Sequence, residues 1–390
     1  MQPDTKTEPA PPRTDSPGAV TIVANHVGRV GGMERQLAEL ALGLRAKGHE
    51  VTVIAHECQL PADSGVVFRR VPGPSRPFLL GYPWFVLVAS LALRRWRRGV
   101  VQATGAIVLG KVDVVAVHYC HQVGVITASR SAWPYRAHVK AMGLLSRLGE
   151  RLCFNANASA TFVCVSEGVS EEIATHYPRL AQRTVTIYNG VDTDKFSPTA
   201  HQPQARAMRE RLGIAPERLV VTFVGSEWER KGLGAAIAAL ADSPEWDLVV
   251  VGEGDERHYR ELARSLGVGE RVHWPGVMRD VHVAYALADA FVLPSSYETF
   301  SLVTFEAAAS GLAVLATPVN GVRELIEDGV NGFLIDQNAD LIAARLRQLA
   351  GDAQLRRDLG AAARESALRF SWQRMVSEHE RLYASLPRVA

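Results

Sequence analysis

Short apolar runs alternate along this chain with longer stretches in which apolar residues recur every three or four positions. The first run, residues 19–24, is apolar almost throughout, as is typical of a strand buried on both faces of a parallel sheet. A glycine-containing loop at residues 28–32 follows, and apolar positions from Leu37 to Leu44 then have helical spacing that ends at Gly48. Further strands are predicted at residues 51–55, 66–71, 100–103, 112–117 and 160–165, and a long helix at residues 136–157. This order predicts an α/β domain.

The second half of the chain repeats this order of elements without repeating its sequence. Apolar runs at residues 219–224 and 248–251 predict strands, and residues 292–294 close another. The polar residues 199–204, which include a proline, separate the halves. We therefore predict an N-terminal domain at residues 19–198, a C-terminal domain at residues 205–370, and a helix within residues 371–390 that crosses back to the first domain. Residues 1–18 carry five prolines among polar residues and are predicted to be a disordered tail.

The stretch 294–317 predicts the end of a strand, a loop, a helix and a second strand. The residues before Leu302 cannot hold a strand, apolar positions after it recur at helical spacing, and Gly311 ends the helix. At the carboxyl edge of a parallel sheet, such a turn directs the backbone N–H groups of Phe300, Ser301 and Leu302 at one point. The helix dipole favours negative charge at that point. A phosphate or a group of sugar hydroxyls would suit it.

Two glutamates lie in this stretch, Glu298 before the predicted helix and Glu306 about two turns into it. One interpretation is structural: Glu298 is an acid at a helix start, and Glu306 is a solvated helix residue. The other is that the two carboxylates flank one crevice. Glu306 follows Phe305 and precedes three alanines, so its carboxylate is predicted to be half buried and to need a partner.

Arg230 and Lys231 stand just before a helix predicted at residues 232–240. Cations are disfavoured at a helix N-terminus unless an anion binds between them and the helix. A local conflict of this kind is a hint of function. We expect these side chains to meet an anionic ligand.

His118 and His121 follow the strand predicted at residues 112–117. Their spacing could suggest a metal site, but no second cluster of histidines or cysteines accompanies them, and we predict none. A histidine at the end of a parallel strand lies where open α/β sheets bind ligands. The alternative is a hydrogen-bonded loop histidine.

Composition is that of a globular protein of 390 residues, with 47% hydrophobic and 22% charged residues. The 43 basic and 41 acidic side chains leave a net charge of +2, so no global field recruits nucleic acid. The four cysteines form no C-x-x-C pair and are predicted to be buried thiols in a reducing compartment. No apolar signal core is found near the N-terminus, and we expect a cytoplasmic protein.

The most membrane-like stretch runs from Phe78 to Arg98. It is predicted to be too broken to span a bilayer, because Pro83 leaves only residues 84–93 uninterrupted. One interpretation is a buried helix with arginines at its solvated end. The other is an interfacial patch in which Trp96 and four arginines contact an anionic membrane, so that the protein binds peripherally to the inner face of the cell membrane.

Several of these motifs together resemble the retaining glycosyltransferases of family four, which have GT-B architecture. The resemblance is carried by two glutamates separated by seven residues before a small-residue helix, by the glycine loop, and by Asn-Gly-Val-Asp at residues 189–192. The run 225–232, Gly-Ser-Glu-Trp-Glu-Arg-Lys-Gly, looks like the lipopolysaccharide-core glucosyltransferase branch. Many members carry Arg where this chain has Ser226, and Gly where it has Ser301.

The resemblance implies two Rossmann-like domains that face a central cleft and bind a nucleotide diphosphate sugar. His118 would contact the donor sugar near its reacting carbon, and Glu298 would contact the sugar as well. Lys231 and Arg230 would hold the pyrophosphate, and Glu306 the ribose hydroxyls, so we expect the partners of Lys231 and Glu306 to belong to the donor. The remaining donor-binding residues implied are Gly31, Gly32, Gly252, Glu253, Val277, Met278, Thr299, Phe300, Ser301 and Leu302.

The function implied is transfer of a hexose-type sugar to an acceptor hydroxyl, with retention and without a metal or other cofactor. Acceptors would be glycan, lipid-linked or small molecules of cell-envelope or glycoside biosynthesis. Two alternatives remain: a GT-B nucleotide-sugar epimerase or phosphorylase, and a non-catalytic nucleotide-sugar-binding protein, which Ser301 leaves open because its side chain lies near the sugar loop.

Overall fold

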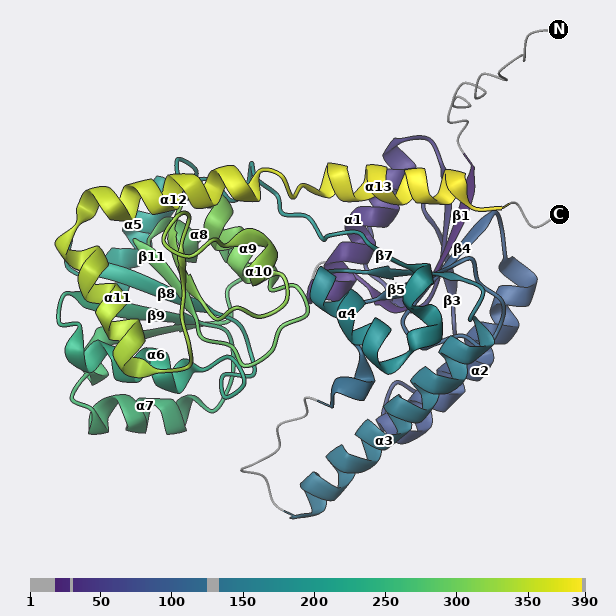
Figure 1. The fold of residues 1–390 in the computed structure, drawn as a ribbon, viewed down its shortest axis with the longest axis horizontal. Coiled ribbons are helices and arrows are strands. Elements are labelled where there is room, and N and C mark those ends of the chain that lie inside the picture. Colours follow the sequence, from purple (N-terminus) through teal and green to yellow (C-terminus); the bar gives the residue numbers. More distant parts are fainter. Residues whose placement is uncertain (1–17, 29–30, 125–132, 388–390) are drawn as a thin grey trace, which may run out of the picture.

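The computed structural model describes residues 18–28, 31–124 and 133–387, and they form two α/β domains (Figure 1). The predicted tail, residues 1–18, lies outside the described residues except for Gly18, as do Arg29 and Val30 of the first loop. Each domain contains one parallel sheet with helices on both faces. The predicted fold class, two Rossmann-like domains, is therefore confirmed.

The N-terminal domain is built on a seven-stranded parallel sheet with strand order β3-β2-β1-β4-β5-β6-β7. Its strands are β1 (Ala19–Val27), β2 (Glu50–Cys58), β3 (Val67–Arg70), β4 (Val100–Thr104), β5 (Val114–Val117), β6 (Thr161–Cys164) and β7 (Thr184–Thr186). Its helices are α1 (Gly32–Ala46), α2 (Phe78–Trp96), α3 (Trp133–Ala156) and α4 (Glu167–His176). The buried, β-branched composition of the central strands explains why they pair in parallel between two helical layers.

The C-terminal domain contains a six-stranded parallel sheet with strand order β10-β9-β8-β11-β12-β13. Its strands are β8 (Leu219–Val224), β9 (Trp246–Val251), β10 (Val272–Gly276), β11 (Ala290–Leu293), β12 (Ala313–Ala316) and β13 (Phe333–Leu334). Its helices are α5 (Gln202–Arg211), α6 (Leu233–Ala239), α7 (Glu256–Ser265), α8 (His282–Ala286), α9 (Leu302–Ala309), α10 (Val322–Leu325), α11 (Ala339–Gly351) and α12 (Ala353–Ala367). The chain then returns to the N-terminal domain in α13 (Trp372–Ser385), which packs against α1 (Figure 1).

Helix α2 differs from its prediction. The expected interruption at Pro83 is wrong, because the helix runs from Phe78 to Trp96 with Pro83 in its second turn. A proline this early removes one backbone donor near the helix start, and the later turns continue. Among the described residues, α2 alone is long and apolar enough to cross a membrane. Its Phe85, Ala89 and Leu93 are nevertheless buried in the core of the domain.

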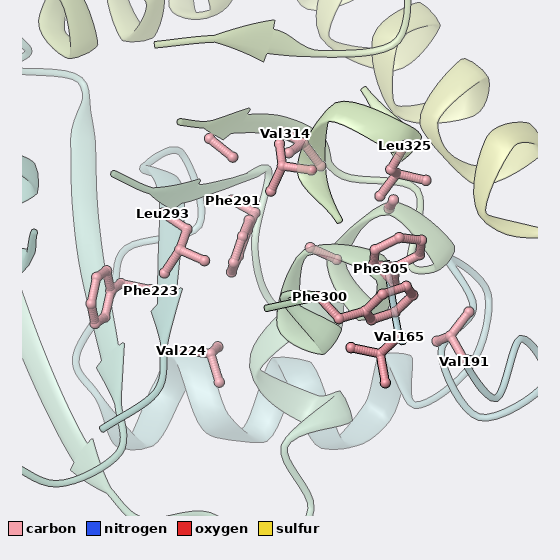
Figure 2. Packing of buried hydrophobic residues seen from close by; sticks show 14 of the residues in the cluster. Val165, Val191, Phe223, Val224, Phe291, Leu293, Phe300, Phe305, Val314 and Leu325 are labelled. Atoms are coloured by element: carbon pink, nitrogen blue, oxygen red, sulfur yellow. The ribbon is translucent and has the colours of Figure 1, made fainter. Parts of the chain in front are cut away.

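The two domains share one continuous apolar seam beside α9. Phe300 and Phe305 stack with ring centroids 4.2 Å apart, and Figure 2 shows them beside Val165 and Val191 of the N-terminal half. All four belong to the same buried cluster, which extends into the cores of both sheets. This packing fixes α9 at the boundary between the domains.

A polar layer is buried between the N-terminal sheet and α13. The Tyr383 hydroxyl donates to Gln102 Oε1 at 2.7 Å, and His379 Nδ1–H donates to the carbonyl of Met375 at 2.9 Å. Burial lowers the pKa of His379 to about 4, and burial with the nearby His379 lowers the pKa of His118 to about 4 as well. Both imidazoles are therefore neutral at neutral pH.

We expect the free energy of unfolding to fall as the pH falls from about 6.5 to about 4. In that window the unfolded chain binds protons at both histidines, whereas the folded chain does not. His379→Gln should reduce the slope by up to about 1.4 kcal/mol per pH unit. Chemical denaturation across the pH range measures the slope. The matched control is His138→Gln at an exposed site, and equal slopes for the wild type and His379→Gln would contradict the expectation.

Candidate active site

The two predicted anion-binding loops of the C-terminal domain lie side by side. Arg230 and Lys231 are in the loop after β8, Glu298 is in the loop after β11, and the two strands are neighbours in the sheet. From β8 the sheet extends to β9 on one side and β11 on the other. The loops therefore open at the topological switch point, where open α/β sheets bind their ligands.

Glu298 is buried in a cluster of hydrogen-bond donors. Its Oε1 accepts from Lys231 Nζ at 2.6 Å, from Arg230 Nη1 at 3.2 Å and from Ser295 Oγ at 3.0 Å. Only 10% of the Lys231 side chain and 11% of the Glu298 side chain are exposed. Among the described residues, none donates to Glu298 Oε2. The second oxygen is left for a ligand.

The opposite charges in this cluster favour the ionised forms of Glu298 and Arg230. Burial raises the pKa of Glu298, but the positive charges of Lys231 and Arg230 outweigh it, and the pKa lies below its ordinary value. Burial lowers the pKa of Arg230, but Glu298 and Glu227 outweigh this and raise it. Glu298 and Arg230 are therefore ionised at neutral pH. Lys231 and Arg230 both contact the buried Glu298, and Arg230 also pairs with Glu227, whose side chain is 68% exposed.

The start of α9 presents its backbone donors as predicted. Ser301 precedes the helix in the left-handed region, with φ 62° and ψ 56°. Its hydroxyl is hydrogen-bonded to Thr304 Oγ1 at 2.7 Å, so its side chain is engaged within the turn. No described residue accepts a hydrogen bond from the backbone N–H of Phe300, Ser301 or Leu302. These N–H groups remain available to a ligand.

The glycine loop of the N-terminal domain faces this helix start. A Cβ added to Gly32 would lie 3.3 Å from Leu302 Cδ1, so the loop and the start of α9 meet across the domain boundary. Gly31 has a φ of +91°, which a residue with a side chain rarely adopts. The structure therefore places Gly32 against the start of α9, with Gly31 next to it in the chain.

The loops expected to surround a nucleotide base lie at the ends of β9 and β10. Gly252 has a φ of +128°, and a Cβ there would lie 2.1 Å from the Gly225 carbonyl oxygen, so only glycine fits between the loops. Glu253 and Val277 are exposed, and Met278 packs partly against the core. These side chains are accessible to a ligand.

Glu306 is where a prediction fails. We expected its partner, and that of Lys231, to belong to the donor. Instead Glu306 Oε1 accepts from Arg35 Nη1 of α1 at 2.6 Å, and Oε2 accepts from the Tyr285 hydroxyl at 3.0 Å. The Glu306 side chain is 6% exposed, because α9 packs against the interdomain seam. Its desolvation therefore requires a partner within the chain. Glu298 and Glu306 belong to separate ion-pair clusters.

His118 lies at the end of β5, as predicted. Its Nε2–H donates to Gln36 Oε1 at 3.1 Å, and its buried Nδ1 has no partner among the described residues. The backbone N–H of His121 donates instead to the buried Glu150 at 2.6 Å, which makes it a loop residue of the N-terminal domain. The described part of the chain contains no group of three or more histidine, cysteine and carboxylate side chains that could hold a metal ion.

Comparison with known proteins now identifies the family. Residues 30–195 match the model of Glycosyltransferase Family 4, and residues 204–366 match that of Glycosyl transferases group 1. A D-inositol 3-phosphate glycosyltransferase of Xylanimonas cellulosilytica is 31% identical over 389 residues, covering 92% of each chain. An uncharacterised glycosyltransferase of Methanocaldococcus jannaschii is 28% identical over 378 residues, covering 91% of this chain and 94% of the relative. The chain belongs to glycosyltransferase family 4.

Solved structures show that this glycosyltransferase has the GT-B fold. WaaG, a glycosyltransferase involved in lipopolysaccharide biosynthesis, superposes with a TM-score of 0.79 at 23% identity, over 94% of this chain and all of WaaG. Anabaena HepE, solved in complex with UDP-glucose, superposes with a TM-score of 0.73 at 20% identity, over 95% of this chain and all of HepE. Both superpositions include the two parallel sheets of this chain.

Several residues of the site were not predicted for this glycosyltransferase. Arg35 and Tyr285 hold Glu306, and Ser295 completes the cluster around Glu298. Trp228 fixes the loop after β8: its ring is buried, and its Nε1–H donates to the Gly225 carbonyl at 2.8 Å. For Ser295 and Trp228, sequence proximity to the motifs was an available signal. Arg35 and Tyr285 lie far from Glu306 in the sequence, so no local pattern indicated that they contact it.

Lys231→Met should destabilise this glycosyltransferase without any ligand, because it removes one of two cations beside a buried carboxylate. We expect a loss of about 1–3 kcal/mol, less than the full cost of an isolated buried charge because Arg230 and Ser295 still donate. Adding Glu298→Gln should recover part of the loss. Chemical denaturation measures each variant.

The matched control for that cycle is Arg260→Met in the exposed pair Arg260–Glu256, where we expect a loss below about 1 kcal/mol. An unchanged stability of Lys231→Met would contradict the ion-pair assignment. So would a double variant that is less stable than the sum of the two single variants.

Proposed function

We propose that this glycosyltransferase moves a hexose from a nucleotide diphosphate sugar to an acceptor hydroxyl, with retention of configuration at the anomeric carbon and without a divalent metal. The observation that carries the proposal is the buried cluster of Lys231, Arg230 and Glu298 beside the unpaired N–H groups at the start of α9. A diphosphate leaving group needs positive charge and fixed hydrogen-bond donors, and this cluster provides both.

The transfer step breaks the bond between the anomeric carbon and the leaving phosphate oxygen. The acceptor oxygen forms the new bond on the same face of the sugar, and its proton passes to the departing phosphate. The ammonium of Lys231 and the N–H groups of Phe300, Ser301 and Leu302 stabilise the charge that develops on the diphosphate. One preorganised donor of this kind contributes about 2.7–4 kcal/mol to catalysis.

The sugar meets Glu298 and His118 in this proposal. Glu298 stays ionised when the donor binds, because its pKa lies below the ordinary value, and its free Oε2 accepts a hydrogen bond from a sugar hydroxyl. His118 is neutral and adds no charge near the anomeric carbon. Fixed cations replace a divalent ion at the diphosphate, so we propose that activity needs no metal.

The similar proteins support a donor class and several acceptor classes. HepE is solved with UDP-glucose, which supports UDP-hexose as the first donor to test. WaaG acts in lipopolysaccharide biosynthesis, and the relatives near 30% identity are named D-inositol 3-phosphate glycosyltransferases. We propose an acceptor in cell-envelope glycan, glycolipid or glycoside biosynthesis and a cytoplasmic enzyme. The Ser301 hydroxyl is engaged by Thr304 within the turn, which supports the proposal that it does not obstruct the donor sugar.

The experiment that tests the function is a panel of radiolabelled nucleotide sugars incubated with glycan, glycolipid and inositol phosphate acceptors in excess chelator. We expect free nucleoside diphosphate and a new glycoside whose anomeric proton coupling matches that of the donor. Lys231→Ala should lower kcat/KM at least about tenfold. Release restored only by Mg²⁺ or Mn²⁺ would contradict metal independence, and conversion of the sugar without transfer would indicate an epimerase.

We also propose that the N-terminal domain contacts an anionic membrane through α2 and α3. Two stripes of exposed apolar residues, spaced three or four positions apart, follow these helices: Leu80, Trp84, Leu87 and Leu91 on α2, and Leu144, Leu148 and Leu152 on α3. The helices pack closely, since a Cβ at Gly149 would lie 2.1 Å from the Tyr82 hydroxyl oxygen (Figure 1). The stripe on α3 was not foreseen.

Positive charge accompanies these stripes. Arg94, Arg95 and Arg98 are exposed near the end of α2, and Arg147 and Arg151 are exposed on α3. Near an anionic surface each such charge contributes about 1 kcal/mol. An apolar stripe bordered by arginines is typical of peripheral rather than spanning helices. A lipid-linked acceptor could then reach the cleft from the bilayer surface.

We expect the protein to sediment with phosphatidylglycerol vesicles and not with phosphatidylcholine vesicles, and to be released at about 1 M salt, where screening is nearly complete. Leu87→Glu and Leu148→Glu should each weaken sedimentation. The matched control is Leu368→Glu, at an exposed leucine of the C-terminal domain. Retention in the pellet after a carbonate wash would contradict peripheral binding, and concentration-dependent dimerisation lost in the same variants would indicate a protein interface.

A further inference from the structure

Arg35 lies where the two chain connections between the domains come together. Its guanidinium carbon is 5.7 Å from the ring centroid of Phe196, just before the chain enters the C-terminal domain. It is 5.6 Å from the ring of Trp372, where the chain returns in α13. Cation–π contacts of this kind hold a guanidinium in place while leaving its N–H fork free to bind a carboxylate.

That fork crosses the domain boundary to Glu306. The 2.6 Å contact joins α1 of the N-terminal domain to α9 of the C-terminal domain, and it is almost completely buried on the Glu306 side. Tyr285 of α8 donates to the other oxygen. A carboxylate has about four acceptor positions, so both oxygens can still accept from the hydroxyls of a ribose. Glu306 is therefore oriented by two residues but not saturated.

We infer that Arg35 is a positioning residue for the transfer reaction: it orients the Glu306 carboxylate for the donor ribose, and it makes that orientation depend on closure of the two domains. The inference rests on the proposed function, in which Glu306 binds the donor. It adds a residue from the opposite domain that touches no part of the donor in this role.

The charges around Glu306 support this inference. Burial raises the pKa of Glu306, while the positive charge of Arg35 lowers it, with smaller contributions from the Tyr285 hydrogen bond and the charge of Lys195; the net pKa lies above the ordinary value. Burial and Glu306 raise the pKa of Tyr285 well above its usual range, so this hydroxyl stays a donor. Arg35 is the one cation in direct contact with Glu306 among the described residues.

Removing Arg35 should therefore raise the pKa of Glu306 further and open the domains. Without Arg35, Glu306 becomes protonated at a higher pH, so the loss of nucleotide affinity on acidification has a higher midpoint pH. An opposite charge in contact shifts a carboxyl pKa by about 1–3 units. Arg35→Lys keeps the charge and should retain most of the effect, whereas Arg35→Gln should not.

The test measures the affinity of UDP, GDP and ADP by calorimetry from pH 4.5 to pH 8, using the nucleotide that the wild type binds best. In Arg35→Gln the midpoint of the acid loss of affinity should rise by at least about one pH unit. Arg35→Lys should lie near the wild type. The double variant Arg35→Gln/Glu306→Gln should lose this pH dependence, and titration of the nucleotide itself cancels between variants.

A second measurement needs no nucleotide. The radius of gyration of the free protein, from small-angle X-ray scattering, should increase in Arg35→Gln and stay at the wild-type value in Arg35→Lys. Lys195→Gln is the matched control, since it removes a nearby charge that makes no contact with Glu306. Unchanged midpoint and radius in Arg35→Gln would overturn the inference. If no nucleotide binds the wild type, the proposed function fails, and the radius alone decides whether Arg35 governs closure.

Discussion

A carboxylate removed from water costs several kcal/mol unless cations or hydrogen-bond donors meet it, and this chain buries two of them in one loop and helix. Glu298 is neutralised inside the C-terminal domain by Lys231 and Arg230. Glu306 is neutralised by Arg35 from the other domain. The two ion pairs differ in consequence. The first lies within one domain, at the proposed anion site, whereas the second forms only when the two domains are in contact.

The loop that carries Glu298 is hydrogen-bonded to the N-terminal domain at two of its residues. The Ser166 hydroxyl donates to the Thr299 carbonyl at 2.7 Å, and the Tyr297 hydroxyl donates to Glu172 of α4 at 3.1 Å. The start of α4 thus borders the same turn whose backbone N–H groups have no acceptor among the described residues. The shape of the proposed anion site therefore depends on both domains, although its charged groups come from one.

Local sequence was sufficient for the fold and for part of the site. The two parallel sheets, the helix after Ser301 and the strand ends that carry Arg230 and Glu298 follow from apolar periodicity and glycine positions, which are local properties. The Arg35–Glu306 pair joins residues 271 positions apart, so no local pattern could reveal it. The continuation of α2 through Pro83 is likewise a tertiary effect, since packing of its apolar face outweighs one lost backbone bond.

The hydrogen bonds of the two cations differ in a way that bears on the proposed diphosphate site. The Nε and Nη2 atoms of Arg230 donate to Glu227, and its Nη1 contacts Glu298 and the Tyr297 carbonyl, so all three of its nitrogens are engaged. Lys231 has three donors, and within the described part of the chain it uses one of them, on Glu298. Arg230 therefore links the loops after β8 and β11. Lys231 is the cation that retains N–H groups for a further hydrogen bond. Glu298 offsets the charge of the buried ammonium, so in the proposed function Lys231 keeps this ion pair and donates to the phosphate with its remaining N–H groups.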